Sequence, residues 1–400
     1  MAIQHHPAAP PAYGRLLSLD AFRGMTIATM ILVNTPGSWS HVYGPLRHAP
    51  WHGWTPTDLV FPFFLFIVGV AMSFSFSRHL SQGMPVKDLR VKLVRRALII
   101  FGLGIFLAGY PFNIPFNGQE LKTSFHMVDI LKRFETIRVM GVLQRIAVCY
   151  LLAGFTVTAT GRRGRLMTTI GLLAGYWLLM VLVPVPGFGR GDLSLEGNLA
   201  RYIDLALLRA NHMYSLGGVP FDPEGLLSTL PATATTLLGV FVGDYLRQSG
   251  DLRRKAATLL VAGMVGIAAG KVLSYGFPIN KQIWTSSYVV FTAGWATLIL
   301  GIMFWIVEVK GLKKVVQPFI VFGSNSIFVF VASGLVVKTI VRITVTYENQ
   351  DLTFYTLLYK SIFVPLAGSL NGSLLFAVTW ICVWLGILWI LYWRRIFIKI

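Results

Sequence analysis

Long runs of this sequence contain no Asp, Glu, Lys or Arg, and this feature most restricts what the chain can fold into. Each run is long enough for a bilayer-spanning helix, which needs about 20 apolar residues. The runs contain Gly and Pro without the alternation of a transmembrane β-barrel. Among them are residues 59–77, 97–119, 225–243, 282–307, 315–337 and 361–393. The pattern predicts an all-α protein embedded in a membrane.

The composition supports this class. Only 13% of the residues are charged and the mean hydropathy is +0.66, whereas a soluble protein would carry roughly 25% charged residues. The two cysteines, Cys149 and Cys382, both lie in apolar runs. Packing is their expected role, and no disulfide is predicted.

The basic residues predict the orientation of the chain. The formal net charge of +19 arises largely from clusters that recur at every second loop, which is the positive-inside pattern of membrane proteins. Such clusters favour anionic lipid as a partner, and no nucleic acid partner is expected. The clusters are Lys87–Arg96, Arg162–Arg165, Arg247–Lys255, Lys310–Lys314 and Arg394–Lys399. Both termini are therefore expected on the cytoplasmic side.

We predict a polytopic integral membrane helix bundle of about 10 transmembrane helices plus one re-entrant or interfacial helix. The eleventh apolar segment, 354–369, receives the second description because a further span would place the C-terminal basic cluster on the wrong side. Residues 1–16 are expected to form a short cytoplasmic tail, and 17–400 a single transmembrane domain. The ten predicted helices are 17–35, 58–79, 93–111, 139–160, 166–184, 226–246, 255–273, 284–307, 315–340 and 373–396.

Polar side chains inside predicted spans are costly in a bilayer, so each is a candidate for function. Arg23 lies at the cytoplasmic start of the first helix, where it either extends to the lipid headgroups or contacts a ligand. Asn34 lies near the other end of this helix, and its amide needs hydrogen-bond partners. Ser324 and Asn325 lie about two turns inside the cytoplasmic half of the ninth helix.

The stretch RHAPWHGWTPTDLVFPFF at 47–64 contains a helix start. Thr55 is the expected N-cap, Pro56 the first helical residue, and Asp58 the residue that closes a variant capping box. Capping alone would explain Asp58, so its structural role competes with a functional one. Trp51 and Trp54 are typical of the aromatic belt at a membrane interface.

The roles of two histidines in the same stretch remain open. His48 and His52 face the outer side of the membrane in the predicted topology. A histidine at a helix mouth is usually an ordinary interfacial residue. Beside an aromatic lid it can also serve as a base or an acyl acceptor.

Further polar residues gather at the outer mouth. Gln144 and Arg145 enter the outer half of the fourth helix, and a buried arginine usually meets a carboxylate or a ligand phosphate. Asp58 is one possible partner for Arg145. Lys281 and Trp284 flank another outer helix mouth.

The loop 185–225 holds five acidic residues that we expect to be largely exposed. Asp222 and Glu224 close this loop, where helix capping competes with ligand binding. A loop of this length more often carries function than a short one.

The sequence contains no motif of a soluble enzyme: no P-loop, G-x-S-x-G, H-E-x-x-H or C-x-x-C. No metal site is predicted. The polar residues instead form one set at the outer mouth and one in the inner half of the bundle. This arrangement suits a transporter and equally an enzyme that passes a group across the membrane.

Several motifs distinguish these alternatives. The segments LSLDAFRGMTIATMILVN, RHAPWHGWTPTDLVFPFFLFIVG, GVLQRIAVCY, FDPEGLLSTLPATATTLLG, PINKQIWTSS and GSNSI occur in this order. Together they resemble the heparan-α-glucosaminide N-acetyltransferase family, from about residue 15 to the C-terminus. The resemblance implies a bacterial inner-membrane acyltransferase that moves acetyl from cytosolic acetyl-CoA to the amino group of a glucosamine-type sugar on the far side. It also makes a homodimer plausible.

The resemblance assigns roles to individual residues. The family's essential histidine lies in a K-H-A-x-W context, which matches His48 in RHAPW, whereas His52 inherits no role. The family's important asparagine matches Asn34. Asp58 is the third expected catalytic residue, orienting His48 or pairing with Arg145.

The expected ligand contacts follow the same two sets of residues. Arg23, Ser324 and Asn325 are expected to contact acetyl-CoA. The expected contacts of the sugar are Trp51, Gln144, Arg145, Asp222, Glu224, Lys281 and Trp284. Two alternatives remain: a permease for a sugar or an anionic metabolite, without chemistry, and an O-acyltransferase that acts on a glycan hydroxyl.

Overall fold

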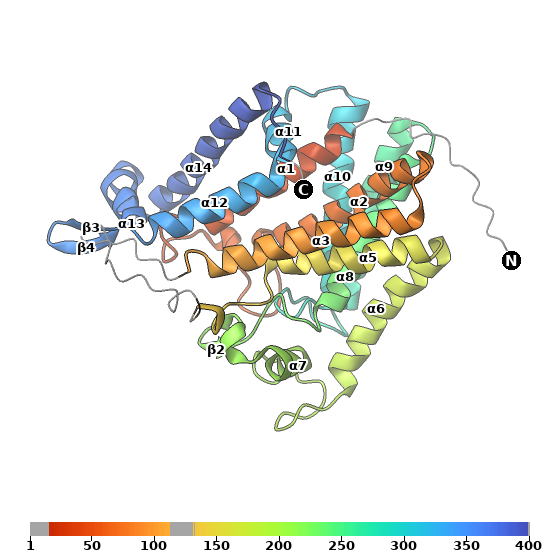
Figure 1. Ribbon diagram of the computed structural model, residues 1–400, viewed down its shortest axis with the longest axis horizontal. Helices are drawn as coiled ribbons and strands as arrows, with labels where there is room; N and C mark the ends of the chain where they lie inside the picture. The colour runs from red at the N-terminus through yellow and green to blue at the C-terminus, as the bar shows by residue number, and fades with distance from the viewer. Residues whose placement is uncertain (1–15, 113–130, 132, 399–400) are drawn as a thin grey trace.

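The computed structural model describes residues 16–112, 131 and 133–398, and these residues form a bundle of helices with two small β-hairpins (Figure 1). The all-α prediction is confirmed, with a helix at each of the ten predicted positions. The predicted tail 1–16 lies outside the described residues except for Leu16. The main helices are α1 (Leu17–Asn34), α2 (Val60–Ser81), α3 (Val86–Gly109), α5 (Val142–Ala159), α6 (Arg162–Leu182), α8 (Thr229–Arg247), α9 (Leu252–Leu273), α10 (Ser286–Phe304), α11 (Gln317–Ser324), α12 (Ser326–Ile340) and α14 (Val364–Trp393).

Shorter elements lie in the connections. Three short 3₁₀ helices are η1 (Gly44–Leu46), η2 (Pro56–Leu59) and η3 (Ala210–His212). Two short π-helical segments are η4 (Trp305–Val309) and η5 (Tyr359–Phe363). The remaining helices are α7 (Leu199–Leu208) and α13 (Phe354–Leu358). Strands β1 (Ser215–Leu216) and β2 (Val219–Pro220) form one antiparallel hairpin, and β3 (Thr344–Tyr347) and β4 (Gln350–Thr353) form the other.

Six helices in the described part of the chain are long and apolar enough to cross a membrane, and the bent pair α11–α12 would add a seventh. The predicted number of about ten spans is therefore not confirmed. Three predicted spans are less apolar: α1 contains Asp20 and Arg23, α3 begins with a basic cluster, and α8 is rich in threonine. The six are Pro56–Ser81, Val142–Ala159, Arg162–Leu182, Leu252–Leu273, Ser286–Val309 and Phe354–Trp393.

The predicted ninth helix, 315–340, is not continuous. It breaks at Asn325, and its two parts, α11 and α12, meet at an angle of 79°. The segment 354–369 is helical and joins α14, with a kink at Gly368, whose φ of 74° lies in the left-handed region. The last helix therefore begins before the predicted residue 373. An interfacial position for the segment before the kink stays a prediction.

Helix α1 lies at the centre of the bundle and contacts α2, α10, α11, α12 and α14. Its approach to α11 depends on glycine on both sides. A Cβ on Gly24 would lie 1.7 Å from the Phe319 carbonyl oxygen, and one on Gly323 would lie 2.0 Å from that of Asp20. Small residues at such crossings let two backbones touch, which is typical of helix packing in membranes.

The crossing of α2 and α8 is built in the same way. A Cβ on Gly69 would lie 1.9 Å from the Thr236 carbonyl oxygen, and one on Gly239 would lie 2.1 Å from that of Phe66. Because these obstacles are backbone atoms, a side chain can be accommodated only if the helices move apart. The N-terminal end of α2 carries the residues of the 47–64 stretch, so this crossing also positions them.

Replacing Gly239 with leucine is expected to destabilise the protein by about 1–3 kcal/mol, the usual cost of overpacking a tight contact. Thermal unfolding in detergent, followed by tryptophan fluorescence, measures this effect. Gly171 on α6 is a matched control, because no atom lies within 4 Å of a Cβ built there. A Gly239→Leu protein that melts with Gly171→Leu and the wild type would show that the two helices do not pack this closely.

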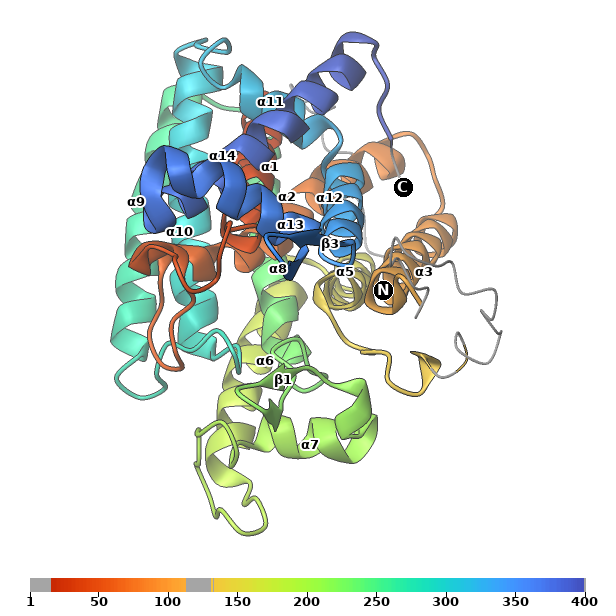
Figure 2. The same cartoon turned by 90° about the vertical axis from the view of Figure 1, so that its left-hand side faces the viewer.

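A small cap lies beneath the ends of α6 and α8 (Figure 2). It contains α7 and the β1–β2 hairpin. Its apolar core joins Leu199, Ala200 and Phe221 to Tyr176 and Met180 of α6.

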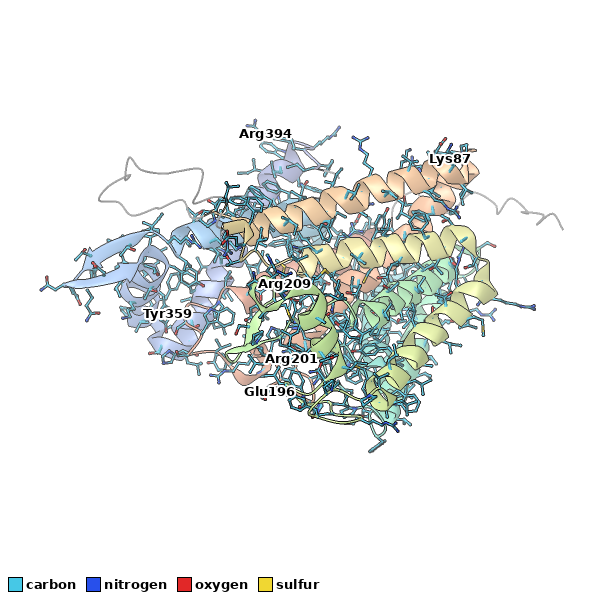
Figure 3. All side chains as sticks on the ribbon, turned by 60° about the horizontal axis from the view of Figure 1, so that its bottom comes forward. Lys87, Glu196, Arg201, Arg209, Tyr359 and Arg394 are labelled. Carbon is cyan, nitrogen blue, oxygen red and sulfur yellow. The ribbon has the colours of Figure 1, made fainter. Side chains whose placement is uncertain are left out.

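The two ends of the bundle differ in their loops. Figure 3 shows Lys87 at the start of α3 and Arg394 after α14 on the opposite side of the molecule from Glu196 and Arg201 of the cap. The basic clusters that contain Lys87 and Arg394 therefore lie on the opposite side of the molecule from the cap.

Candidate functional site

The loop before α2 is held in shape by the predicted capping box. The Asp58 carboxylate accepts hydrogen bonds from the Thr55 backbone N–H, at 3.0 Å, and from the Ala49 N–H, also at 3.0 Å. Pro56 opens η2, as predicted. The Tyr288 hydroxyl donates to the Asp58 backbone carbonyl at 2.5 Å and ties this turn to α10. Capping fixes the Asp58 carboxylate in the loop that contains His48.

His48 and Asp58 are in direct contact. The His48 Nδ1 lies 2.6 Å from the Asp58 Oδ1. The Asp58 side chain is 1% exposed and that of His48 is 44% exposed, so the pair joins a buried carboxylate to an accessible ring. Asp58 therefore caps the helix and contacts His48 at the same time.

Lys281 is the third member of this cluster. Its Nζ lies 3.0 Å from the His48 Nδ1 and 3.4 Å from the Asp58 Oδ1. Burial lowers the pKa of Lys281, although the Asp58 and Glu224 carboxylates act in the opposite direction.

His52 lies in the same loop as His48 but has a different partner. The Asn280 amide, next to Lys281 in the chain, contacts the His52 Nδ1 at 3.3 Å, and burial lowers the pKa of His52. The two histidines thus contact neighbouring residues of one loop.

Asp222 and Glu224 are both paired with Arg138. The Arg138 Nε and Nη2 donate to the Asp222 carboxylate at 3.0 and 2.6 Å, and Nη2 also contacts Glu224. Burial alone would raise the pKa of Glu224. The surrounding cations, above all Arg138, lower it by more than burial raises it, so this pKa lies below its usual value. The expectation of exposed acids in 185–225 is wrong for Asp204, Asp222 and Glu224, which are buried. Tertiary pairing and burial in the cap remove them from the surface.

Arg145 does not pair with Asp58. Its buried guanidinium donates to the Gly225 carbonyl oxygen at 2.9 Å and to the Ser228 hydroxyl, while its Nε and Nη1 have no hydrogen-bond partner in the described part of the chain. The guanidinium lies 5.1 Å from the ring centroid of Trp284. Trp284 is 1% exposed and therefore belongs to the core beneath the site.

The remaining outer candidates lie apart from the His48 cluster. Trp51 donates to the Leu193 carbonyl oxygen at 2.8 Å and packs on Phe221, so it anchors the loop to the cap. Gln144 is buried beside Gly104 of α3. Asn34 is exposed at the last position of α1, and no described residue hydrogen-bonds its side chain. The structure therefore brings together His48, Asp58 and Lys281.

A cavity of about 420 Å³ lies in the other half of the bundle, between α1, α2, α3, α5 and α12. The residues that α2 contributes recur at intervals of three or four and form one helix face. They extend from Phe64 to Ser75, about 16 Å along the axis at the helical rise per residue. Arg23 and Ser324 line this cavity, so two of the three predicted acetyl-CoA contacts share it.

Asn325 has a different position. Its amide donates to the Ile396 carbonyl oxygen at 3.0 Å and accepts from the Ile398 N–H at 2.8 Å. Phe397 and Ile398 line the cavity. Asn325 thus holds the C-terminal segment that forms one wall.

Sequence reasoning missed one cation of this cavity. Arg96 lines the cavity and lies 5.3 Å from the ring centroid of Tyr150. Arg96 is the last basic residue before the charge-free run that begins at 97. Within the cluster Lys87–Arg96 it is therefore the residue that lies deepest along the helix, toward the interior of the bundle. Its position next to the apolar run could have distinguished Arg96 from the basic residues that face the lipid.

The arrangement can perform proton transfer at an accessible imidazole, supported by a buried carboxylate and a partly buried ammonium. The described residues contain no group of three or more His, Cys, Asp or Glu side chains that could hold a metal ion. A separate elongated cavity follows the same helix, α2, that carries the imidazole cluster at its end. The geometry suits a group-transfer reaction with two binding regions.

Comparison with known proteins adds an independent observation. Residues 15–275 match the family described as "Heparan-alpha-glucosaminide N-acetyltransferase, catalytic". The mouse heparan-alpha-glucosaminide N-acetyltransferase is 32% identical over 355 residues, which cover 79% of this chain and 53% of the mouse protein. The human protein of the same name is 31% identical over 376 residues, or 81% of this chain and 53% of its own length.

The chain thus spans about half the length of the curated relatives it matches. The family match begins just before α1 and extends through α8 and α9. It therefore contains His48, Asp58, Arg138 and Glu224. The chain belongs to the heparan-alpha-glucosaminide N-acetyltransferase family.

Proposed function

We propose that this protein is a transmembrane acetyltransferase that moves acetyl from cytosolic acetyl-CoA to the amino group of a glucosamine-type sugar on the opposite side. The observation that carries the proposal is the His48–Asp58 contact of 2.6 Å at one end of α2, with a cavity along the same helix. Family membership supports the reaction class. We further propose a bacterial inner-membrane location with cytoplasmic termini, lipid contacts at the basic clusters, and a homodimer.

His48 acts as the general base in this proposal. When its Nδ1–H donates to Asp58, its Nε2 carries a lone pair and can accept the proton of the acceptor amine. The amine nitrogen forms a bond to the acetyl carbon, and the bond from that carbon to the CoA sulfur breaks. The thiolate leaves with the electron pair of the broken bond and takes the proton from His48. The products are the N-acetyl sugar and CoA.

The cavity provides a route for acetyl-CoA from the basic side of the bundle. Arg23, Arg96 and Ser324 line it together with the apolar face of α2. Phe64, its outermost lining residue on α2, lies six residues from Asp58, or about 9 Å along the axis. An extended pantetheine is roughly two-thirds of the ~30 Å hydrocarbon core in length. Extended along α2 from Ser75, such an arm would carry the thioester beyond Phe64 toward His48 while the nucleotide stays at the basic end.

Asn34 completes the proposed catalytic set. We assign it the hydrogen bond to the thioester carbonyl oxygen, where negative charge develops during attack. This assignment rests on the match to the family's asparagine and on its place at the end of α1. We assign the sugar to the side of the bundle where Trp51 contacts the cap and Arg138 binds Asp222 and Glu224.

Two experiments test the proposal. In proteoliposomes, CoA release from acetyl-CoA should depend on an added amine such as glucosamine. Counterflow of sugar without CoA would instead establish a permease, and acetylation of hydroxyl-only glycans would establish an O-acyltransferase. Labelled acetyl-CoA without acceptor distinguishes the two chemical routes: label on His48 shows a covalent acetyl carrier, and its absence shows direct transfer.

Asn325→Ala is expected to raise the KM for acetyl-CoA about 5- to 100-fold, because two hydrogen bonds that hold the cavity wall are lost, each worth about 0.5–1.5 kcal/mol. The KM for the sugar should not change. Asn371→Ala is the control, since that amide accepts from the Tyr43 hydroxyl away from the cavity lining. An unchanged KM for acetyl-CoA would separate this wall from the acetyl-CoA site.

A further inference from the structure

The Lys281 ammonium has an unusual position relative to the His48 ring. Its Nζ lies 3.0 Å from Nδ1 and 3.4 Å from Nε2. The two ring nitrogens flank a single carbon, so a point in the ring plane this close to both would overlap that carbon. The ammonium therefore lies over the face of the imidazole. In that position it does not occupy the in-plane lone pair of either nitrogen.

The hydrogen bonds of the ring follow from this geometry. Nδ1 cannot donate to Asp58 and accept from Lys281 at the same time, because a ring nitrogen carries either a proton or a lone pair. The 2.6 Å contact with Asp58 is the shorter of the two. With the proton on Nδ1, the lone pair of Nε2 faces away from Asp58 and stays open to a substrate.

The loop that carries Lys281 is rigidly held. The Asn280 side-chain oxygen accepts from the Ile283 N–H at 3.1 Å, and the Asn280 N–H donates to the Thr285 hydroxyl at 3.1 Å. The Gly53 N–H donates to the Ile279 carbonyl oxygen at 2.8 Å, which joins this loop directly to the His48 loop. Lys281 is thus placed on the ring by its backbone as well as by its charge.

We propose that Lys281 is a positioning residue that keeps His48 neutral and its Nε2 available as the base, rather than a ligand of the sugar. The inference rests on the proposed function and adds a residue to it. A carboxylate beside an imidazole favours the protonated ring, whereas a cation at the same distance opposes it. Asp58 orients the ring, and Lys281 offsets the effect of that carboxylate on its charge.

The other described charged groups around the site have contacts of their own and do not touch the His48 ring. Glu224, from the turn before α8, acts on Lys281 through its charge and is itself bound by Arg138. Arg145 is buried beneath Trp284. On the His48 loop, the Arg47 Nε donates to the Val42 carbonyl oxygen at 2.8 Å. Among the described cations, Lys281 is the one in contact with the ring.

The test is the pH dependence of kcat/KM for Lys281→Met. Without the ammonium, Asp58 favours the imidazolium, so the acidic limb of the profile should move to higher pH by about one unit. At the pH where this limb lies, kcat/KM should fall about tenfold with the KM for the sugar unchanged. Lys281→Arg keeps a positive charge and should restore the wild-type limb. Melting temperature and CoA binding show that both variants are folded.

Two results would overturn the inference. One is a wild-type pH profile in Lys281→Met, and the other is a higher KM for the sugar with no shift of the limb, which would make Lys281 a sugar ligand. Either result leaves the proposed function intact if His48→Ala is inactive. Full activity of His48→Ala would instead contradict the role of His48 itself, so the two failures are distinguishable.

Discussion

Replacing His48 with alanine is expected to lower acetyl transfer by a factor of about 10²–10⁴, the usual contribution of a general base, while the protein still folds and binds CoA. The side chain is 44% exposed, and its contacts are with Asp58 and Lys281. Its removal leaves no cavity in the core. The helix cap at Asp58 remains, because the Thr55 and Ala49 backbone bonds do not involve the ring. Mass spectrometry of the acetylated sugar and release of CoA measure the loss.

His52→Ala is the matched control for this experiment. His52 lies four residues away in the same loop but contacts Asn280 rather than Asp58, so its loss should change turnover far less. CoA binding to both variants, measured by calorimetry in detergent, should match the wild type. Turnover at the wild-type rate by His48→Ala would rule out a catalytic role for this residue. Equal losses in the two variants would indicate a general effect of disturbing the loop.

The features that could be predicted from the sequence depend on neighbouring residues. Charge-free runs and basic clusters identify helices one at a time, and each predicted helix exists. The capping box of Thr55 and Asp58 is likewise local. Because His48 lies only ten positions from Asp58, the same turn brings the pair together. Here local chemistry was sufficient.

Contacts between distant residues could not be predicted in this way. Lys281 reaches His48 across 233 positions, and Arg138 reaches Asp222 across 84. Hydropathy does not indicate which helix ends meet, and the sequence alone therefore leaves Asp58 as a possible partner for Arg145. The packing instead pairs Arg145 with the turn before α8.

The break at Asn325 has a similar origin. No proline interrupts this helix at the break, but Asn325 lies between Ser324 and Ser326 and follows Gly323, and Gly and Ser neighbours are a known site of helix kinks. The Asn325 side chain binds the backbone of the C-terminal segment 71 and 73 positions away. The bend therefore combines a local Gly and Ser sequence with a tertiary contact that the sequence does not reveal.

Replacing Asp204 with asparagine is expected to stabilise the protein at pH 8 and to change its stability little at pH 4. Asp204 is 1% exposed, and its carboxylate accepts from the Leu226 N–H at 2.8 Å. Burial raises the pKa of Asp204 to about 7, whereas an unfolded aspartate has a pKa of about 3.9. Asparagine keeps a carbonyl oxygen for the Leu226 N–H and cannot ionise.

The direction of the pH effect follows from these two values. The folded protein holds the Asp204 proton more tightly than the unfolded chain, so this contribution to stability is complete below pH 4. It is lost as the pH rises through about 7. A difference of about three pKa units corresponds to roughly 4 kcal/mol at most. The melting temperature of Asp204→Asn should therefore exceed that of the wild type increasingly from pH 5 to pH 8.

Glu196→Gln is the control, because Glu196 belongs to the same outer segment but is exposed at the surface (Figure 3). Its melting temperature should follow the wild type at every pH. A constant difference between Asp204→Asn and the wild type would show that Asp204 ionises alike in the folded and unfolded chains. A lower melting temperature of the variant at pH 8 would show that the charged carboxylate stabilises the turn. The sign of the difference at alkaline pH therefore determines whether the pKa of this buried acid is higher or lower in the folded protein than in the unfolded chain.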